Sequence, residues 1–376
     1  MPLAVAQYND HYFHQVPLGL ARYGRELDVA LRAQGVTVRP VGAWSNMEAG
    51  PLDALRAATG GVVLPGGRRS WIARWSLLRR PRIETLVDPV DIVHFTAPCY
   101  PVPTGKPAVA TIHDLGVFTH PRFFGKAYPR FFHAHLQQMD KRGDRIIAVS
   151  DFSAEQWRTH INPKTRVEVI AEGVADVFRV VETDDARALV LKRHKLDRPF
   201  FLAAGSLNPR KNVVRLVQAF SALLDELPHD LVLAGARGWD DEEIWRSIGD
   251  SRVRDRVRFV GFVEDSELNV LYRSAAAFVF VSLFEGFGLP AAEAMAGGCP
   301  VVASNTTSLP GVVGAGGLLV DPTSVADIGA ALRRIATDHA LRTDLAARAV
   351  VRSAAFSWQE AATATHAIYR EMLAGS

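Results

Sequence analysis

The sequence predicts an α/β protein with two Rossmann-like domains that face each other across a cleft. Two observations lead to this class. Short apolar runs alternate with longer stretches of helical periodicity along the whole chain. A charged segment near residues 178–199 separates two such series. Strands that are buried on both faces and separated by helices form parallel sheets with right-handed crossovers.

Ten apolar runs are expected to form the strands of these sheets. They are rich in Val, Ile, Phe and Ala, which suits a strand that helices cover on both faces. In chain order the expected strands cover residues 3–7, 91–95, 108–112, 145–149, 167–170, 200–204, 230–234, 257–260, 277–281 and 300–303.

The chain is expected to divide into four segments. An N-terminal Rossmann-like domain takes residues 1–178, and a charged linker takes residues 179–198. A C-terminal Rossmann-like domain takes residues 199–355, and residues 356–376 have the pattern of a terminal helix. Ligands of open α/β sheets collect at the carboxyl ends of the strands, so the chemistry is expected there.

Composition describes an ordinary globular protein. The chain has 376 residues, 48% of them hydrophobic and 22% charged, and a net charge of +3 that does not point to nucleic acid. Cys99 and Cys299 are far apart and show no metal spacing, which favours a reducing cytoplasm. We expect no transmembrane helix, because no apolar run approaches about 18 residues. We also expect no signal peptide, because the first residues lack a charged region followed by a long apolar run.

The most informative motif lies in residues 278–294, where a buried strand leads into a glycine-containing loop and a helix that Pro290 opens. Gly286 and Gly288 let the backbone approach a ligand closely. Free amides between Phe287 and Ala291 then face the ligand, with the positive end of the helix dipole behind them. The candidate donors for a phosphate include the amides of Gly286, Phe287, Gly288 and Leu289.

Two carboxylates flank this anion site, at Glu285 and Glu293. The segment between them, Glu-Gly-Phe-Gly-Leu-Pro-Ala-Ala-Glu, resembles the two-glutamate signature of the retaining GT-B glycosyltransferases, which include many bacterial mannosyl- and glucosyltransferases. This resemblance implies a nucleotide-sugar donor in the C-terminal domain. It also implies that Glu293 holds the ribose and that Glu285 holds sugar hydroxyls near the reacting carbon. In this family the terminal helix crosses back onto the N-terminal domain.

A second motif, residues 205–212, places Arg210 and Lys211 just before a helix. Two cations there oppose the helix dipole, and a bound anion reverses that effect. Arg210 can grip a phosphate with two hydrogen bonds, and Lys211 adds a point charge. The resemblance implies that this pair, together with Ser206, binds the donor diphosphate. It also implies that the backbone at Val263 meets the nucleobase.

His113 ends an expected strand in the N-terminal half, where its imidazole could bind a sugar hydroxyl. It resembles the family's histidine at the donor sugar. The surrounding stretch, His-Asp-Leu-Gly-Val-Phe-Thr-His-Pro-Arg-Phe-Phe, resembles members that act in O-antigen and exopolysaccharide synthesis, many of which use GDP-mannose. The loop at residues 17–23 resembles the family's first glycine loop, with Gly19 beneath the donor and Arg22 facing the acceptor.

Two positions depart from the family pattern. Gly311 stands where many relatives carry a glutamate, and Glu172 replaces the usual asparagine of an Asn-Gly-Val turn. No Asp-x-Asp triplet occurs, and the acidic run at residues 240–243 fits the first turn of a helix better than a metal site. We therefore expect catalysis without metal or cofactor, in which Arg210, Lys211 and helix amides supply the positive charge.

Residues 68–82 contain six arginines and two tryptophans. On a helix, Trp71, Trp75 and Leu78 share a face, and a basic helix with tryptophan suits an anionic membrane surface. The alternative is a helix packed on the N-terminal sheet with its basic side in solvent. The first interpretation predicts a cytoplasmic enzyme that is peripheral on the inner face of the membrane.

The resemblance implies a retaining glycosyltransferase that moves mannose from GDP-mannose onto a glycan or lipid-linked acceptor in bacterial polysaccharide synthesis. No protein nucleophile is apparent, so attack from the face of the departing diphosphate is favoured. A UDP-glucose or UDP-N-acetylglucosamine donor is the first alternative, and a sugar-nucleotide epimerase the second. A non-catalytic binding module would not need these polar residues. A dinucleotide oxidoreductase is disfavoured because no Gly-x-Gly-x-x-Gly follows the first strand.

Overall fold

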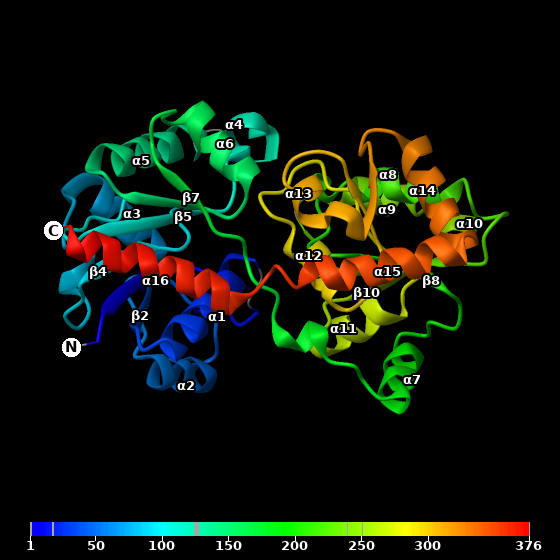
Figure 1. The fold of residues 1–376 in the computed structure, drawn as a ribbon, viewed down its shortest axis with the longest axis horizontal. Coiled ribbons are helices and arrows are strands. Elements are labelled where there is room, and N and C mark those ends of the chain that lie inside the picture. The colour runs from blue at the N-terminus through cyan, green and yellow to red at the C-terminus, as the bar shows by residue number, and fades with distance from the viewer. Residues whose placement is uncertain (1, 17–18, 124–127, 239, 250, 376) are drawn as a thin grey trace. The chain divides into compact units, whose positions relative to one another are not determined.

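The computed structural model describes residues 2–16, 19–123, 128–238, 240–249 and 251–375 (Figure 1). The chain forms two compact units. The first consists of Met1–Gly173 with Ser357–Ser376, and the second consists of Val174–Phe356. Each unit is built around a parallel sheet with helices packed on it, so the α/β class and the two Rossmann-like domains are confirmed.

The first unit has a sheet of seven strands in its described residues, in the order β3-β2-β1-β4-β5-β6-β7. All neighbouring strands are parallel, and the order reverses direction between β1 and β4. The strands are β1 (Ala4–Tyr8), β2 (Thr37–Gly42), β3 (Val62–Val63), β4 (Ile92–Phe95), β5 (Ala108–Ile112), β6 (Arg145–Ala148) and β7 (Val167–Val169).

Helices cover this sheet and enclose an aromatic core that includes Trp75, Phe95 and Trp157. The last helix, α16, packs on α1, and Gln34 Nε2 donates to Thr363 Oγ1 of α16 at 2.9 Å. The helices are α1 (Leu20–Ala33), α2 (Ala49–Thr59), α3 (Gly67–Leu78), α4 (Gly116–Thr119), α5 (Tyr128–Arg142), α6 (Asp151–His160) and α16 (Trp358–Ala374), with 3-10 turns η1 (Ile83–Thr85) and η2 (Pro121–Phe123).

The second unit has a sheet of six described strands in the order β10-β9-β8-β11-β12-β13, and the order reverses between β8 and β11. Ligands of such sheets bind where the strand order reverses, at the carboxyl ends of the two strands. The strands are β8 (Phe200–Ala204), β9 (Asp230–Ala234), β10 (Val257–Gly261), β11 (Ala277–Phe280), β12 (Val301–Ser304) and β13 (Gly317–Val320).

Apolar residues of both sheet faces and the flanking helices form the core of this unit. Its longer helices are α7 (Asp184–Arg193), α8 (Val213–Ser221), α11 (Asp265–Ser274), α12 (Leu289–Ala296), α14 (Val325–Thr337) and α15 (His339–Ser353). The shorter ones are α9 (Glu242–Ser247), α10 (Ser251–Arg254) and α13 (Leu309–Val313), with 3-10 turns η3 (Asp176–Arg179), η4 (Pro209–Lys211) and η5 (Gly314–Gly316).

All ten expected strands form, and their ends differ from the expected ones by at most one residue. Three strands, β2, β3 and β13, were not expected. In β2, Arg39 and Pro40 interrupt the apolar pattern, and proline is uncommon inside a sheet. The strand β3 has only two residues, and β13 begins at a glycine.

The segment expected to be a linker, residues 179–198, belongs to the second unit instead. Its helix α7 packs on α11, and Arg193 Nη1 lies 2.6 Å from Glu267 Oε1. Asn269 Nδ2 also donates to Val180 O at 2.9 Å. The boundary between the units falls after Gly173 rather than after residue 178, because these contacts attach the charged segment to α11.

Candidate active site

The candidate anion site of the second unit lies where its strand order reverses. The turn η4 follows β8, and residues 282–288 follow β11 and lead into α12. The two loops are tied together, because Leu283 N donates to Arg210 O at 2.8 Å. Asn212 fixes the base of η4 by donating to Val281 O at 2.9 Å and to Pro322 O at 2.7 Å. The sequence thus brings its two chemistry-bearing motifs to one edge of the sheet.

A three-membered ion cluster occupies this edge. Arg210 Nη1 lies 2.7 Å from Glu285 Oε2, and Lys211 Nζ lies 2.8 Å from Glu285 Oε1. Arg210 Nη1 also donates to Phe284 O at 2.7 Å. Lys211 Nζ lies 4.3 Å from the centre of the Phe280 ring. Each oxygen of Glu285 therefore pairs with one of the two cations that are expected to bind the donor diphosphate.

The electrostatics of the cluster follow from its burial. Burial lowers the pKa of Lys211 to about 8, with Arg210 adding to this effect and Glu285 opposing it. Burial opposes ionisation of Glu285, but Arg210 and Lys211 outweigh it and lower the pKa of Glu285 to about 2. At neutral pH the carboxylate is charged and most of the lysine is protonated, so the cluster holds two cations and one anion.

Gly288 is required by the conformation of the glycine loop. Its φ is 105°, and a Cβ added there would lie 2.5 Å from Leu309 Cδ2. Ser308 holds the loop through its hydroxyl, whose one proton is shared between Glu285 O at 3.0 Å and Phe287 O at 2.8 Å. Sequence reasoning did not single out Ser308, because its role depends on the packing of α13 beside the loop.

One detail of the expected anion site is wrong. Ala291 N donates to Gly288 O at 2.9 Å, so this amide is used inside the helix. Pro290 has no N–H, so the expected run of amides from Phe287 to Ala291 is reduced to Phe287, Gly288 and Leu289. Glu293 is buried on α12 and helps to keep Lys211 charged. Ser206 and Val263 lie just beyond the carboxyl ends of β8 and β10.

In the first unit His113 follows β5, and both of its ring nitrogens have protein partners. His113 Nε2 lies 2.8 Å from Thr96 O, and Nδ1 lies 3.0 Å from Glu172 Oε1. Ser153 Oγ donates to the backbone oxygen of His113 at 2.8 Å. The ring of Tyr23 meets the imidazole edge to face at 4.6 Å. The expected bond from a ring nitrogen to a sugar hydroxyl would have to replace one of these contacts.

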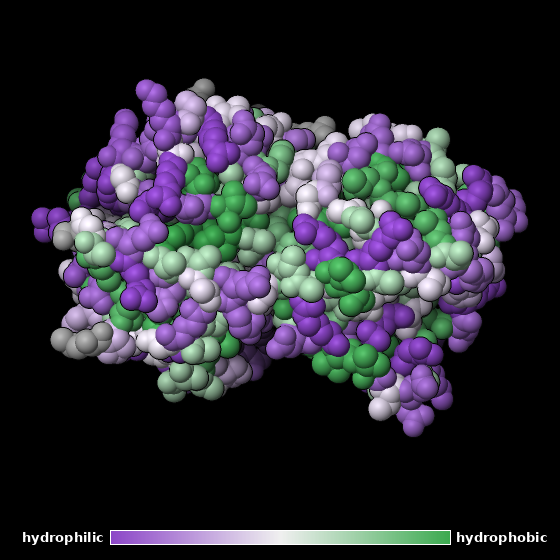
Figure 2. Space-filling model, viewed as in Figure 1, coloured by the Kyte–Doolittle hydropathy of each residue, from purple (hydrophilic) through white to green (hydrophobic). Residues whose placement is uncertain are grey.

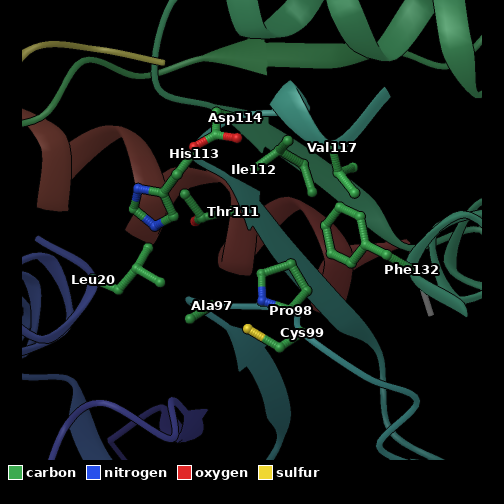
Figure 3. Close-up of a pocket in the computed structure, with 10 residues that line it drawn as sticks. All are labelled: Leu20, Ala97, Pro98, Cys99, Thr111, Ile112, His113, Asp114, Val117 and Phe132. Atoms are coloured by element: carbon green, nitrogen blue, oxygen red, sulfur yellow. The ribbon is translucent and has the colours of Figure 1, made fainter. Parts of the chain in front are cut away.

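A hollow of about 150 Å³ opens beside His113 at the carboxyl ends of β4 and β5 (Figure 3). In this view His113 and Leu20 lie on one side and Phe132 on the other. The lining is mainly apolar: Leu20, Ala97, Pro98, Cys99, Thr111, Ile112, His113, Asp114, Val117 and Phe132. Gly19 caps α1 with a φ of 34°, and Arg22 lies in the first turn. Pro17 and Leu18 of the expected loop lie outside the described residues.

The prediction that Trp71 and Trp75 of residues 68–82 face a membrane is wrong, because both side chains are buried. Trp71 is 7% exposed and Trp75 is 1% exposed, and both belong to the core of the first unit. Their indole nitrogens donate to Pro65 O at 2.7 Å and to Pro81 O at 3.0 Å. Leu78 does not share their environment, because α3 ends there and Leu78 is 67% exposed.

In the described part of the chain, no group of three or more His, Cys, Asp or Glu side chains is placed to hold a metal ion. The acidic run contributes to α9, where Asp241 Oδ2 accepts from Arg237 Nε at 2.8 Å and from Trp245 Nε1 at 2.9 Å.

None of the described helices is both long enough and apolar enough to span a bilayer. The face drawn in Figure 2 is mainly hydrophilic, with small apolar patches.

The sequence matches two families of known proteins. Residues 190–351 match the family described as glycosyl transferases group 1, and residues 18–176 match glycosyltransferase family 4. The O-antigen chain mannosyltransferase B of Escherichia coli is 36% identical over 268 residues, which cover 70% of this chain and 70% of that protein. The serotype-specific mannosyltransferase WbdA of Escherichia coli is 34% identical over 263 residues, which cover 68% of this chain and 32% of that protein.

Solved structures agree on the fold. Sucrose-phosphate synthase from Thermosynechococcus elongatus has a TM-score of 0.78 and 23% identity over the whole of both chains. WaaG, a glycosyltransferase involved in lipopolysaccharide biosynthesis, has a TM-score of 0.74 and 18% identity over 95% of this chain and 98% of that one. The two Rossmann-like units define the GT-B class. The chain belongs to the group 1 glycosyltransferases, with a family 4 N-terminal half.

Proposed function

We propose that this glycosyltransferase moves mannose from GDP-mannose, with retention of configuration, onto a glycan or lipid-linked acceptor in bacterial polysaccharide synthesis. The observation that carries the proposal is the cluster in which Arg210 and Lys211 converge on Glu285 beside the N-terminus of α12. Two relatives at 36% and 34% identity are mannosyltransferases, one named for the O-antigen chain, which supports the sugar and the pathway class.

The cluster suits a departing diphosphate. When the donor binds, its phosphate oxygens take over Arg210 and Lys211, and Glu285 turns from a partner of these cations to an acceptor for sugar hydroxyls. The bond between the anomeric carbon and the diphosphate breaks as the bond to the acceptor oxygen forms, and the acceptor proton leaves with the diphosphate. Arg210, Lys211 and the loop amides stabilise the negative charge that grows on the leaving group.

The same residues support transfer without a metal ion. Arg210, Lys211 and the amides at the start of α12 are proposed to supply the positive charge with which a divalent ion would otherwise neutralise the diphosphate. Glu293 is proposed to hold the ribose, and Ser206 and Val263 to contact the rest of the nucleotide. His113, Gly19 and Arg22 of the first unit are proposed to serve the donor sugar and the acceptor.

Thermal shift with GDP, UDP, ADP and GDP-mannose, each with and without EDTA, tests the donor. We expect a selective rise with GDP and GDP-mannose that persists in EDTA. A rise with UDP alone would keep the class and replace the donor by UDP-glucose or UDP-N-acetylglucosamine. Conversion of the sugar nucleotide without any acceptor would instead indicate an epimerase.

We also propose that the enzyme works at an anionic membrane surface, through the end of α3. Leu77 is 81% exposed and Leu78 is 67% exposed, and Arg79 and Arg80 follow them directly. Exposed leucines beside arginines suit the boundary between headgroups and acyl chains.

Vesicle flotation tests this surface. The double variant Leu77→Ser and Leu78→Ser should lose binding to vesicles that contain phosphatidylglycerol. The variant Leu189→Ser is a matched control, since Leu189 is 59% exposed on α7, whose first turn is acidic. Equal binding of the double variant and the control would contradict the proposed surface.

A further inference from the structure

Trp44 is the only exposed tryptophan in the part of the chain that the structure describes, with 39% of its surface open to solvent. It lies two residues beyond the end of β2, at the carboxyl edge of the sheet in the first unit. Ligands of open α/β sheets collect at this edge. An indole there offers a ligand a broad apolar surface and one N–H group.

Two histidine rings continue from Trp44 along the edge of the sheet. The ring centres of Trp44 and His14 are 4.6 Å apart, and the rings meet at 85°. The ring centres of His14 and His11 are 4.8 Å apart. Both histidines belong to the loop after β1, which is the neighbour of β2 in the sheet. The three rings therefore form a row from the end of β2 to the end of β1.

Hydrogen bonds between the two loops hold this row in place. Asp10 Oδ1, in the loop after β1, accepts from Ala43 N of the loop after β2 at 2.8 Å. Ser45 Oγ donates to Phe13 O at 2.8 Å in the opposite direction. The rings are thus fixed before any ligand binds. A preorganised surface of this kind loses less conformational entropy on binding than a mobile loop does.

His11 adds hydrogen-bonding groups to the row. Burial lowers its pKa to about 4, and the nearby His14, Arg68 and His113 add to the effect. At neutral pH the ring is therefore uncharged, with one donor and one acceptor nitrogen. Among the described residues its hydrogen bond runs from the backbone N to Asn9 Oδ1, and the ring nitrogens have none. A sugar hydroxyl, which both donates and accepts, suits such a ring.

The row leads to the hollow beside His113. Asn9 Nδ2 donates to the backbone oxygen of Leu20 at 2.8 Å, and Leu20 lines the hollow on the same side as His113 (Figure 3). In the strand order β2-β1-β4-β5, Trp44 is two positions from β4 and three from β5, whose ends form the hollow. With about 4.8 Å between neighbouring strands, this distance is roughly 10–14 Å.

We propose that Trp44 and His11 form an acceptor subsite for the sugar units that precede the reacting one, so that the enzyme selects an oligosaccharide over a monosaccharide. This inference rests on the proposed function. A pyranose unit is about as long as one strand spacing, so the row and the hollow together hold about three units. The reacting unit occupies the hollow, a hydroxyl of the next unit bonds to His11, and the C–H face of the third stacks on Trp44.

Calorimetric titration without any nucleotide sugar tests the subsite. The unsubstituted protein should bind α-linked mannotriose about tenfold more tightly than methyl α-mannoside. The variant Trp44→Ala should lose this advantage and bind methyl α-mannoside as before, and Trp44→Phe should regain part of it. Phe259→Ala is a matched control, because Phe259 is an aromatic residue of the second unit that is 40% exposed. The control should bind both sugars like the unsubstituted protein.

Transfer from GDP-mannose gives a second readout. Trp44→Ala should raise KM for mannotriose by about tenfold and leave kcat nearly unchanged, because Trp44 contacts a unit that does not react. Equal affinity of Trp44→Ala and the control for mannotriose would overturn the proposal. Loss of vesicle binding in Trp44→Ala with unchanged mannotriose affinity would also overturn it, and would assign the indole to a membrane. If no sugar is transferred at all, the proposed function fails, while the titration still decides whether the subsite exists.

Discussion

Lys211 Nζ lies 2.8 Å from Glu285 Oε1, and the second oxygen of the same carboxylate lies 2.7 Å from Arg210 Nη1. In the protein without ligand, both cations are paired with the same carboxylate. A diphosphate must therefore compete with Glu285 for both cations. This competition makes the affinity for nucleotide depend on the charge of Glu285, which leads to the first prediction.

The variant Glu285→Gln should bind free GDP more tightly, by about tenfold, because it removes the carboxylate that competes for Arg210 and Lys211. Transfer of the sugar should nevertheless fall sharply, because the variant loses the proposed acceptor for sugar hydroxyls. The protein without ligand should melt at a lower temperature, because two mostly buried cations lose their counter-ion. Calorimetric titration with GDP measures the affinity.

Glu267→Gln serves as the control for this prediction, since Glu267 pairs with Arg193 away from the cluster. It should leave GDP binding unchanged. Weaker GDP binding by Glu285→Gln than by the control would show that the carboxylate does not compete with the diphosphate.

GDP affinity should fall as pH rises through about 8. Burial lowers the pKa of Lys211 to about 8 in the free protein, so the amine loses its charge above that pH. The bound diphosphate favours the charged amine and raises its pKa in the complex, so binding takes up a proton above pH 8 and becomes weaker. Lys211→Arg should flatten the profile, because a guanidinium stays protonated over this range. An unchanged pH profile in Lys211→Arg would assign the titration to another group.

The variant Ser308→Ala should loosen the glycine loop. It removes the one hydroxyl donor that the buried backbone oxygens of Glu285 and Phe287 share, and the loss should cost about 1–3 kcal/mol of unfolding free energy. We expect kcat to fall with it, because the loop carries Glu285. Ser221→Ala, which removes an exposed hydroxyl bonded to Gln218 O, is the control for chemical denaturation.

The variant Trp75→Ala should destabilise the first unit rather than release the protein from membranes. Trp75 is 1% exposed and donates to Pro81 O, so its removal leaves a large cavity and should cost about 3–5 kcal/mol. Chemical denaturation measures this loss. If the Trp75→Ala protein is stable but no longer binds vesicles, Trp75 contacts the membrane after all.

The sequence was sufficient to predict strands that are apolar on both faces, because a strand buried in a parallel sheet is an unbroken run of apolar residues. It could not predict β2, since Pro40 lies within it and the neighbouring β1 decides its place. Helical periodicity placed Trp71 and Trp75 on one face of α3. It could not distinguish a face that meets the core from a face that meets lipid, because both are apolar.

At the site, residue types predicted which side chains could serve a sugar nucleotide. Their partners in the protein could not be predicted in the same way. Glu172 reaches His113 from 59 positions along the chain, and Thr96 reaches it from 17 positions. These contacts depend on how β4, β5 and the segment after β7 come together. The sequence marked Glu172 only as a departure from the family pattern and did not identify His113 as its partner.

The anomeric configuration of the product tests the central claim most directly. The enzyme would be incubated in EDTA with GDP-mannose and a mannose oligosaccharide, and the new linkage would be assigned by NMR. The account predicts an α-mannosyl product together with GDP, and loss of both in Glu285→Gln. A β-linked product, or transfer that stops in EDTA and returns with a divalent cation, would contradict it.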